Sequence, residues 1–165
     1  MSEVLQFKEL ESADFKVVKE IYDYYILNTT ATWHTEPVSE IELQNAIYVG
    51  HPRYRSYLVY AQGEVIGYCY FSEYKKRQAY YRSSEVTLYL KPDATGKGSG
   101  SIILKKMEEE ASKVGIHTLL GVISGDNEGS ISLFEKNGYT KCALLRNMGE
   151  KFGKLLDIVC YQKEF

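Results

Sequence analysis

A glycine-rich loop between a strand pattern and a long helix pattern restricts the fold of this chain more than any other feature. The loop, residues 91–101, contains three glycines that alternate with other residues. Residues 85–90 before it have the apolar content of a strand, and residues 101–114 after it place apolar side chains on one helical face and charges on the other. Gly115 stands where a left-handed helix cap belongs, and a second strand pattern follows at residues 118–123. A strand, a helix and a strand joined in this way require a parallel pair of strands.

The rest of the chain consists of short strand and helix patterns, without an internal repeat or a linker. The apolar periodicities predict strands at residues 4–9, 57–60, 65–71, 141–148 and 155–162, and helices at residues 12–28, 39–49 and 130–137. A capping box of Ser39 and Glu42 starts the second of these helices, and Gly50 is expected to end it. The glycine-bearing turn at residues 62–64 indicates a hairpin. The order β-α-α-β-β-β-α-β-α-β-β therefore predicts an α+β fold, with a mixed, mostly antiparallel twisted sheet and helices on both faces.

Length and composition are those of an ordinary globular protein. The 165 residues are 44% hydrophobic and 25% charged, which predicts one domain over residues 1–165 and excludes a disordered or fibrous chain. No apolar run approaches the roughly 20 residues of a membrane span, and the start lacks the basic region of a signal peptide, so a cytoplasmic protein is expected. The formal net charge of -2 argues against nucleic-acid binding, which usually needs a basic surface.

Cysteines and histidines give no sign of a metal site. Cys69, Cys142 and Cys160 are odd in number and widely spaced, so they form neither a disulfide framework nor a metal clip. Their apolar and aromatic neighbours indicate reduced thiols in the core. The three histidines lack metal-ligand spacing, and no carboxylates cluster around them in the sequence. No metal is therefore predicted.

The glycines at positions 96, 98 and 100 allow the backbone to approach an anion closely. Main-chain N–H groups of the first helical turn and the positive end of the helix dipole stabilise a phosphate at such a position. A flexible turn without a ligand is the alternative for this motif taken alone. The spacing excludes a P-loop, because Gly98 follows Lys97 where Ser or Thr is required, and a dinucleotide fingerprint would need glycine in place of Ser101.

Further motifs resemble the GNAT family of N-acetyltransferases, in which an acetyl-CoA loop follows a central strand and opens a long helix. Residues 121–127 and 130–139 resemble that family's strand, asparagine, short helix and glycine-aromatic ending. Four more segments resemble its phosphinothricin and methionine sulfoximine acetyltransferase branch, namely residues 30–37, 74–80, 84–90 and 151–157. The resemblance extends over residues 22–165 and implies the GNAT fold, acetyl-CoA as the co-substrate and an amine as the acceptor.

By this resemblance, three parts of the chain bind acetyl-CoA. The central strand offers backbone groups to pantetheine, the glycine loop holds the pyrophosphate, and Asn127 with the helix after it holds the pantetheine arm. The cofactor-binding residues so implied are Leu88, Tyr89, Leu90, Thr95, Gly96, Lys97, Gly98, Ser99, Gly100, Ser101, Asn127, Ser130, Phe134 and Lys136. From the sequence alone, Asn127 is equally compatible with a cap of the helix, and the two roles can coexist.

Glu85 is the candidate general base, because acyl transfer to an amine needs a neutral nucleophile. It begins a largely apolar strand, where partial burial would raise its pKa. A solvated glutamate at a strand end is the alternative, and the resemblance favours the base. The resemblance also implies that the backbone N–H of Leu88 stabilises the carbonyl oxygen as it becomes negative.

Three residues depart from the family pattern. Thr95 stands where Gln or Arg is usual, so Lys97 is the residue expected to supply charge to the pyrophosphate. Phe134 stands where tyrosine or histidine is common and has no proton to donate, so coenzyme A is expected to leave as a thiolate, helped by a thiol pKa of about 8.5. Leu155 replaces a common tryptophan and alters the local packing or the acceptor pocket.

A basic segment interleaved with tyrosines, residues 74–82, is the candidate for acceptor binding. In the resembling branch the matching segment binds an amino-acid carboxylate, which suits the cationic side chains of Lys75 and Arg77. The acceptor-binding residues implied are Trp33, Thr35, Glu36, Tyr74, Lys75 and Arg77. A solvated charged face is the alternative for the basic segment, and an ordinary buried aromatic is the alternative for Trp33.

The predicted function is transfer of the acetyl group of acetyl-CoA to the primary amine of a small amino-acid-like acceptor, of the phosphinothricin or methionine sulfoximine type. Direct attack in a ternary complex and a homodimer are expected from the resemblance, with no nucleic-acid or membrane partner. The alternatives are a protein N-terminal or polyamine acetyltransferase and a non-catalytic CoA-binding sensor. The basic segment argues against polyamines, whereas Phe134 and Thr95 keep the sensor open.

Overall fold

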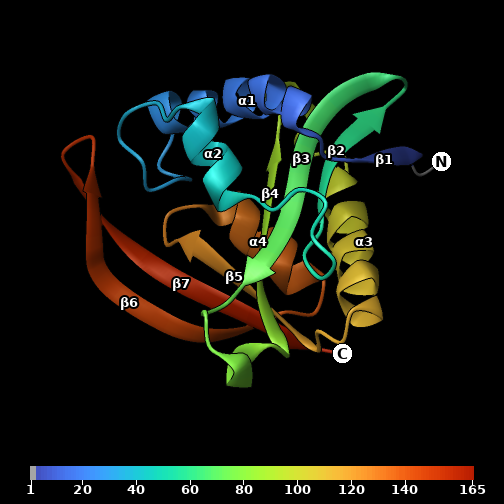
Figure 1. Cartoon of the computed structure of the whole chain (residues 1–165). Coiled ribbons are helices and arrows are strands. Elements are labelled where there is room, and N and C mark those ends of the chain that lie inside the picture. Colours follow the sequence, from blue (N-terminus) through green and yellow to red (C-terminus); the bar gives the residue numbers. More distant parts are fainter. Residues whose placement is uncertain (1–2) are drawn as a thin grey trace.

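The computed structural model describes residues 3–165 and confirms the predicted order of strands and helices (Figure 1). The strands are β1 (Leu5–Glu9), β2 (Ser56–Ala61), β3 (Glu64–Glu73), β4 (Ser83–Leu90), β5 (Thr118–Ser124), β6 (Thr140–Lys151) and β7 (Lys154–Glu164). The helices are α1 (Phe15–Asn28), α2 (Glu40–Ala46), α3 (Ser99–Lys113) and α4 (Glu128–Lys136). Single 3₁₀ turns precede α1 at Ser12–Asp14 and β4 at Gln78–Tyr80, and a third lies within the glycine loop at Pro92–Ala94.

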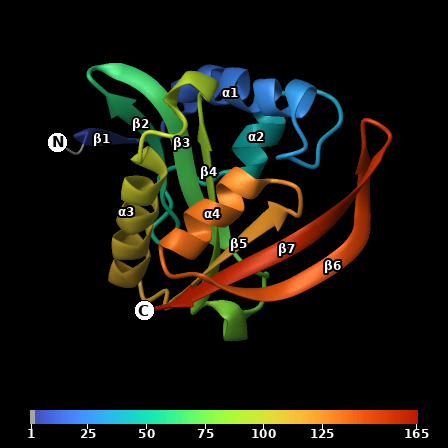
Figure 2. The same ribbon diagram turned by 180° about the vertical axis from the view of Figure 1, so that it is seen from behind.

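The seven strands of the described chain form a mixed sheet in the order β1-β2-β3-β4-β5-β7-β6. Neighbouring strands are antiparallel except β4 and β5, which run parallel, as the pattern around α3 predicted. β6 and β7 form a long curved hairpin at one edge of the sheet, and its tip reaches toward the connection between α1 and α2 (Figure 2).

Helices cover both faces of the sheet, with α1 and α2 on one face and α3 and α4 on the other (Figures 1 and 2). Side chains alternate along β4, so that Val86 packs on the α3 face and Tyr89 on the α1 face. Ile103 and Met107 of α3 and Phe15 of α1 are fully buried against the sheet. Burial of these two apolar layers is the main stabilising term of the fold, and it fixes β4 and β5 at the centre of the sheet.

Several helix boundaries differ from the sequence prediction, and α4 spans Glu128–Lys136 rather than residues 130–137. α2 ends at Ala46 rather than at residue 49, because Ile47 adopts an extended backbone and is buried in the α1-side core. The predicted capping box at its start is confirmed, since Ser39 Oγ accepts from Glu42 N–H at 3.1 Å and Glu42 Oε2 accepts from Ser39 N–H at 3.2 Å. α3 begins at Ser99 rather than at residue 101, so the end of the glycine loop is already helical.

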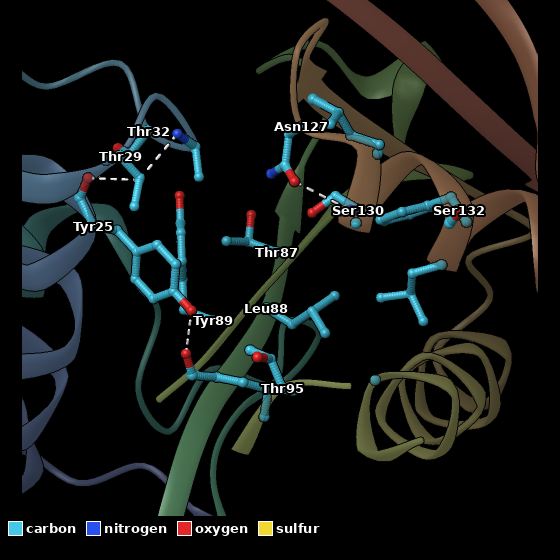
Figure 3. Close-up of a pocket in the computed structure, with 18 of the residues that line it drawn as sticks. Tyr25, Thr29, Thr32, Thr87, Leu88, Tyr89, Thr95, Asn127, Ser130 and Ser132 are labelled. Carbon is cyan, nitrogen blue, oxygen red and sulfur yellow. Dashed lines mark hydrogen bonds between the residues drawn. The ribbon is translucent and has the colours of Figure 1, made fainter. Parts of the chain in front are cut away.

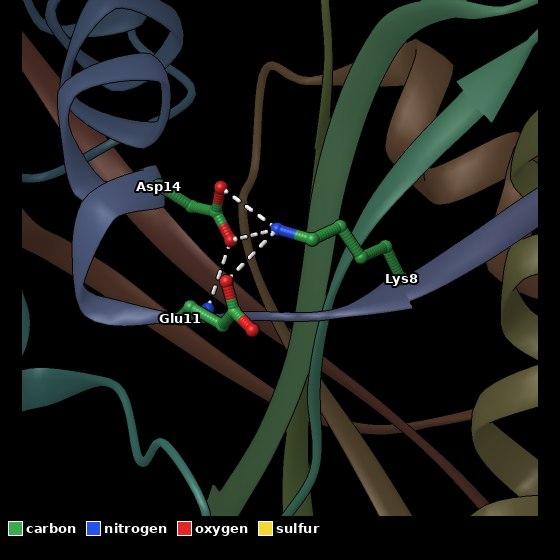
Figure 4. Close-up of polar contacts among 3 residues, drawn as sticks. All are labelled: Lys8, Glu11 and Asp14. Carbon is green, nitrogen blue, oxygen red and sulfur yellow. Dashed lines mark hydrogen bonds and ion pairs between the residues drawn. The ribbon is translucent and has the colours of Figure 1, made fainter.

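A polar cluster fixes the entry into α1 (Figure 4). Asp14 Oδ2 accepts from Glu11 N–H at 2.9 Å, and Lys8 Nζ of β1 lies 2.8 Å from Asp14 Oδ2 and 3.4 Å from Glu11 Oε2. The cluster satisfies a backbone N–H at the start of the 3₁₀ turn. The helix predicted over residues 12–28 therefore begins as a 3₁₀ turn and becomes α-helical at Phe15.

Candidate active site

β4 and β5 separate after a short parallel contact and open a cleft. Their register runs from the Ser83–Thr118 pair to the Glu85–Leu120 pair and stops there. Beyond that point the two strands line opposite sides of a cavity of about 790 Å³, together with the glycine loop, α4 and the connection between α1 and α2 (Figure 3). Cavities of this size are typical of sites for small molecules and cofactors.

One edge of β4 presents backbone groups to this cavity. Lys91 N–H donates to Ile66 O at 2.7 Å on the β3 side. Because successive residues of a strand alternate, the N–H and C=O groups of Leu88 and Leu90 face the other side, where β5 has diverged. The Leu90 carbonyl accepts a hydrogen bond from the Tyr25 hydroxyl. The edge around Leu88 can therefore hydrogen-bond an extended ligand in the way that an added strand would.

The glycine loop after β4 brings main-chain amides to the cavity. Gly96 (φ 73°) and Gly98 (φ 87°) adopt the left-handed conformation that favours glycine, and a Cβ at either position would meet nothing within 4 Å. Gly98 is the N-cap of α3 and no side chain caps the helix, so the first N–H groups of α3 are available to an anion. Gly100 has a packing role, since a Cβ there would lie 2.9 Å from the Leu133 side chain of α4.

Side chains of the loop are largely engaged within the protein. Thr95 Oγ1 donates to a carbonyl of the preceding 3₁₀ turn at 2.9 Å, and Ser99 Oγ donates to Glu3 Oε2 at 3.0 Å. The Ser101 hydroxyl accepts from the asparagine at the end of α4 at 3.0 Å. Lys97 is exposed, and neither it nor Ser99 lines the cavity. Backbone groups are therefore the groups of this loop that remain available to an anion.

Asn127 caps α4 and also lines the cavity. Its Oδ1 accepts from Ser130 N–H at 3.2 Å, and its amide nitrogen lies on the cavity side (Figure 3). Asn127 therefore caps α4, and its amide nitrogen remains available for the second role, which is contact with the pantetheine arm. Ser130 of α4 lies across the cavity from Tyr89 of β4 (Figure 3), and Lys136 also lines the cavity.

Phe134 packs its ring directly on β5. It is 4% exposed, lies edge-on to Tyr139 at 4.8 Å between ring centroids, and covers the α-carbon of Gly121. A Cβ on Gly121 would lie 2.5 Å from Phe134 Cε1, closer than packing allows. The ring therefore both lines the cavity and holds α4 at a fixed distance from β5.

Gly121→Ala is expected to lower the free energy of unfolding by about 1–3 kcal/mol, because the added methyl group overlaps the Phe134 ring. Gly121 does not have a positive φ, so backbone strain does not contribute. Urea denaturation measures the effect, and Phe134→Leu in the same chain should restore part of the loss. An unchanged urea midpoint in Gly121→Ala would show that α4 moves away from β5 without loss of stability.

Glu85 is the carboxylate at the closed end of the cleft. It is half-buried and lines the cavity, as do three other charged residues, Asp126, Glu128 and Lys136. Burial raises the pKa of Glu85 above the ordinary value of a glutamate. A carboxylate with a raised pKa accepts a proton from an ammonium group more readily than an ordinary glutamate does. The sequence expectation for its environment is confirmed.

An aromatic wall closes the α1 side of the cavity, formed by Tyr22, Tyr25, Tyr70, Tyr89 and Trp33. Ring centroids of Tyr22 and Tyr25 lie 5.4 Å and 5.1 Å from that of Tyr89. Burial raises the pKa of Tyr70 to about 12, so the wall is uncharged at neutral pH. The sequence analysis assigned Tyr89 to the cofactor site, whereas Tyr22 and Tyr25 belong to the helix predicted over residues 12–28 and their place at a cavity was not predicted.

The residues predicted to bind the acceptor do not all meet in the cavity. Trp33 lines it, whereas the remaining five lie outside its lining, namely Thr35, Glu36, Tyr74, Lys75 and Arg77. The basic segment lies at the start of β4, with Lys75 Nζ 5.6 Å from the centre of the Tyr74 ring. Its side chains are exposed, which fits the solvated-face alternative within one copy of the chain. Sequence analysis gave no role to two cavity residues that the structure adds here, Thr30 and Asp126.

Two statements about residues 3–165 concern metal binding and membrane insertion. No group of three or more His, Cys, Asp or Glu side chains is arranged to hold a metal ion in this part of the chain. Across the same residues, every helix is too short or too polar to cross a membrane.

Comparison with known proteins extends these observations. The family described as "Acetyltransferase (GNAT) domain" matches residues 7–160. The chain is 30% identical to the L-methionine sulfoximine/L-methionine sulfone acetyltransferase of Salmonella typhimurium, over 92% of this chain and 90% of that protein. It is 28% identical to the phosphinothricin N-acetyltransferase of Streptomyces coelicolor, over 91% of this chain and 90% of that protein.

A solved structure agrees with the fold over the whole chain. A phosphinothricin acetyltransferase from Sinorhizobium meliloti, in complex with AcCoA, superposes with a TM-score of 0.89 and is 30% identical. The match covers 100% of this chain and 89% of that one.

Proposed function

The chain belongs to the GNAT family of acetyltransferases, and from that premise we propose that it acetylates the primary amine of a small amino-acid-like acceptor, of the phosphinothricin or methionine sulfoximine type. It is an acetyl-CoA-dependent N-acetyltransferase. The observation that carries the proposal is the cleft between β4 and β5, which has free backbone groups along one edge, a glycine loop at its open end and Glu85 at its closed end. Relatives named for amino-acid analogues support the acceptor class.

The residues of the cleft fit acetyl-CoA. The left-handed glycines and the uncapped start of α3 suit a diphosphate, and the edge of β4 suits the amides of pantetheine. When bound, acetyl-CoA supplies an activated acetyl thioester. Leu88 N–H lies on the cleft side of β4, where it can donate to the thioester carbonyl oxygen.

Glu85 is the proposed general base. Its raised pKa allows the carboxylate to take the proton of the acceptor ammonium group, which leaves a neutral amine for attack. Phe134 lines the cavity, and its ring has no proton to donate where the family resemblance implies a tyrosine or histidine. We infer that coenzyme A leaves as a thiolate, which a thiol pKa of about 8.5 permits.

Arg77 is proposed to bind the acceptor carboxylate, with Lys75 beside it. The fork of a guanidinium suits a carboxylate, and the segment that carries both side chains precedes the strand of Glu85. Arg77→Ala should raise the KM for the acceptor while the KM for acetyl-CoA stays unchanged. Equal acceptor KM values in the two proteins would remove Arg77 from the site.

We propose that the protein is a cytoplasmic homodimer. All three cysteines are free thiols, which suits a reducing compartment. The β6–β7 hairpin at the sheet edge exposes large apolar side chains, of which Met148 is 59% and Phe152 64% accessible. Light scattering of the purified protein tests the dimer, and the mass of a single chain would end that proposal.

The function is tested by thiol release from acetyl-CoA with a panel of amines. We expect release with phosphinothricin or methionine sulfoximine, and little with a polyamine or with a peptide that has a free N-terminus. Thr95 and Phe134 keep a CoA-binding sensor as the second candidate, because each departs from the residue that the family resemblance implies at its position. A sensor would bind acetyl-CoA and release no thiol with any amine.

A further inference from the structure

Asp126 joins three separate segments at the edge of the cavity. It follows β5, and its carboxylate accepts from Ser124 Oγ at 2.7 Å within the same turn. Thr30 Oγ1, from the connection between α1 and α2, lies 2.9 Å and 2.8 Å from its two oxygens. Lys154 Nζ, from the start of β7, lies 3.0 Å from Oδ2. Both Asp126 and Thr30 line the cavity.

The charge of Asp126 is secured by these donors. Hydrogen bonds from Ser124, Lys154 and Thr30 outweigh the opposing effect of burial and lower the pKa of Asp126 to about 2. The carboxylate therefore remains an acceptor for all of them at neutral pH. The Lys154 side chain is 61% exposed, so the ion pair by itself stabilises little, and the hydroxyl contacts define the geometry.

Neighbouring contacts hold the same three segments together. Lys151, near the tip of the β6–β7 hairpin, is 4% exposed and its Nζ donates to Thr32 O at 3.2 Å. The Trp33 ring lies close to Gly149, within 3.9 Å of where a Cβ would stand. On the other side, Gly125 N–H donates to the Asp157 carbonyl of β7 at 2.9 Å. The hairpin and the β5–α4 turn thus form a rigid support for residues 29–34.

Asp126 connects the two walls of the cavity. Asn127, the next residue, caps α4 on the cofactor side of the cavity. Thr30 belongs to residues 29–34, which carry Trp33 on the opposite wall. We propose that Asp126 is a positioning residue that fixes the acceptor wall, through Thr30, relative to the cofactor side of the cleft. This assignment rests on the proposed function, because it concerns the alignment of acceptor and thioester.

The kinetic test compares Asp126→Asn, Thr30→Val and the double variant with the unmodified enzyme. Loss of a charge-assisted hydrogen bond should raise the KM for the acceptor by about tenfold in Asp126→Asn, and by less in Thr30→Val. The Kd for acetyl-CoA should stay within about twofold, since the cap at Asn127 is untouched. The double variant should be no worse than Asp126→Asn alone, because both changes remove one interaction.

A spectroscopic test does not depend on turnover. Trp33 is the only tryptophan of the chain and lies in the segment that Asp126 is proposed to fix. In both single variants acrylamide should quench the fluorescence of Trp33 more strongly, and the fluorescence anisotropy should fall. Asp14→Asn is the matched control, since Asp14 also pairs with a lysine, Lys8, at 2.8 Å but lies outside the cavity lining, and Trp33 should keep its fluorescence properties there.

The outcomes separate this proposal from the proposed function. If no amine is acetylated, the function fails, while Trp33 quenching still decides the role of Asp126. Unchanged quenching in Thr30→Val and Asp126→Asn overturns the positioning role, as does an increase in the Kd for acetyl-CoA that parallels the acceptor KM. Thr30→Val keeps the test valid if Asp126→Asn fails to fold, because it leaves the carboxylate and Lys154 in place.

Discussion

Glu85→Gln is expected to reduce kcat by about 10²- to 10³-fold, while the Kd for acetyl-CoA changes little. The amide keeps the shape of the side chain and removes its ability to accept a proton. Acetyl-CoA is proposed to bind through the β4 edge and the glycine loop, neither of which involves this side chain. Steady-state thiol release and calorimetry measure the two quantities separately.

The pH dependence of the same variant makes the prediction sharper. Burial raises the pKa of Glu85, so the basic form is present above this raised value and is lost as the pH falls through it. The acidic limb of kcat should therefore lie at higher pH than the ordinary glutamate pKa of about 4.3 would give. Glu85→Gln should lack that limb. An unchanged pH profile in the variant would remove Glu85 from the mechanism.

Stability distinguishes loss of chemistry from loss of structure. A carboxyl group with a raised pKa binds its proton more tightly in the folded state, so its charged form opposes folding above that pKa. At neutral pH, Glu85→Gln should therefore be as stable as the original protein or more stable. Glu64→Gln, at an exposed strand position of the β2–β3 hairpin, is the matched control and should keep full activity.

Local sequence patterns were sufficient for much of the fold and for the backbone conformation of the glycine loop. The capping box at Ser39, the amphipathic face of α3 and the glycines at 96 and 98 each act within a few residues, so their structural meaning is encoded locally. The end of α2 was not predictable in this way, because Ile47 leaves the helix to fill a core built by α1 and β2.

The proposed acceptor side depends on contacts between residues distant in the sequence. Thr30 and Asp126 are far apart in the chain and meet only because the β5–α4 turn faces the α1–α2 connection. Nothing in the pattern around either residue indicates the other. The basic segment shows the converse, because the charge cluster at Lys75 and Arg77 was visible in the sequence while its distance from the cavity lining was not. Pairwise tertiary geometry, rather than local propensity, decides this half of the site.

Gly98→Ala is expected to raise the Kd for acetyl-CoA by about 10- to 100-fold, which corresponds to loss of one charge-assisted hydrogen bond. Gly98 lines the cavity and caps α3, and its Cβ would point into space that no protein atom fills within 4 Å. In the absence of ligand, the only penalty of the methyl group is the left-handed backbone at φ 87°, about 1–2 kcal/mol. With a diphosphate present, the methyl group separates the amides from the anion.

Gly115→Ala at the other end of α3 separates these two effects. Gly115 has φ 76° and a Cβ there would also meet nothing within 4 Å, so the backbone penalty matches that of Gly98→Ala. Both variants should lose similar stability in urea denaturation, and only Gly98→Ala should lose affinity for acetyl-CoA by calorimetry. Equal Kd values in the two variants would mean that the loop does not hold the diphosphate. That result would show that the backbone amides, which we propose in preference to Thr95 or Lys97, do not bind the anion. Another group would then have to align the thioester with Glu85.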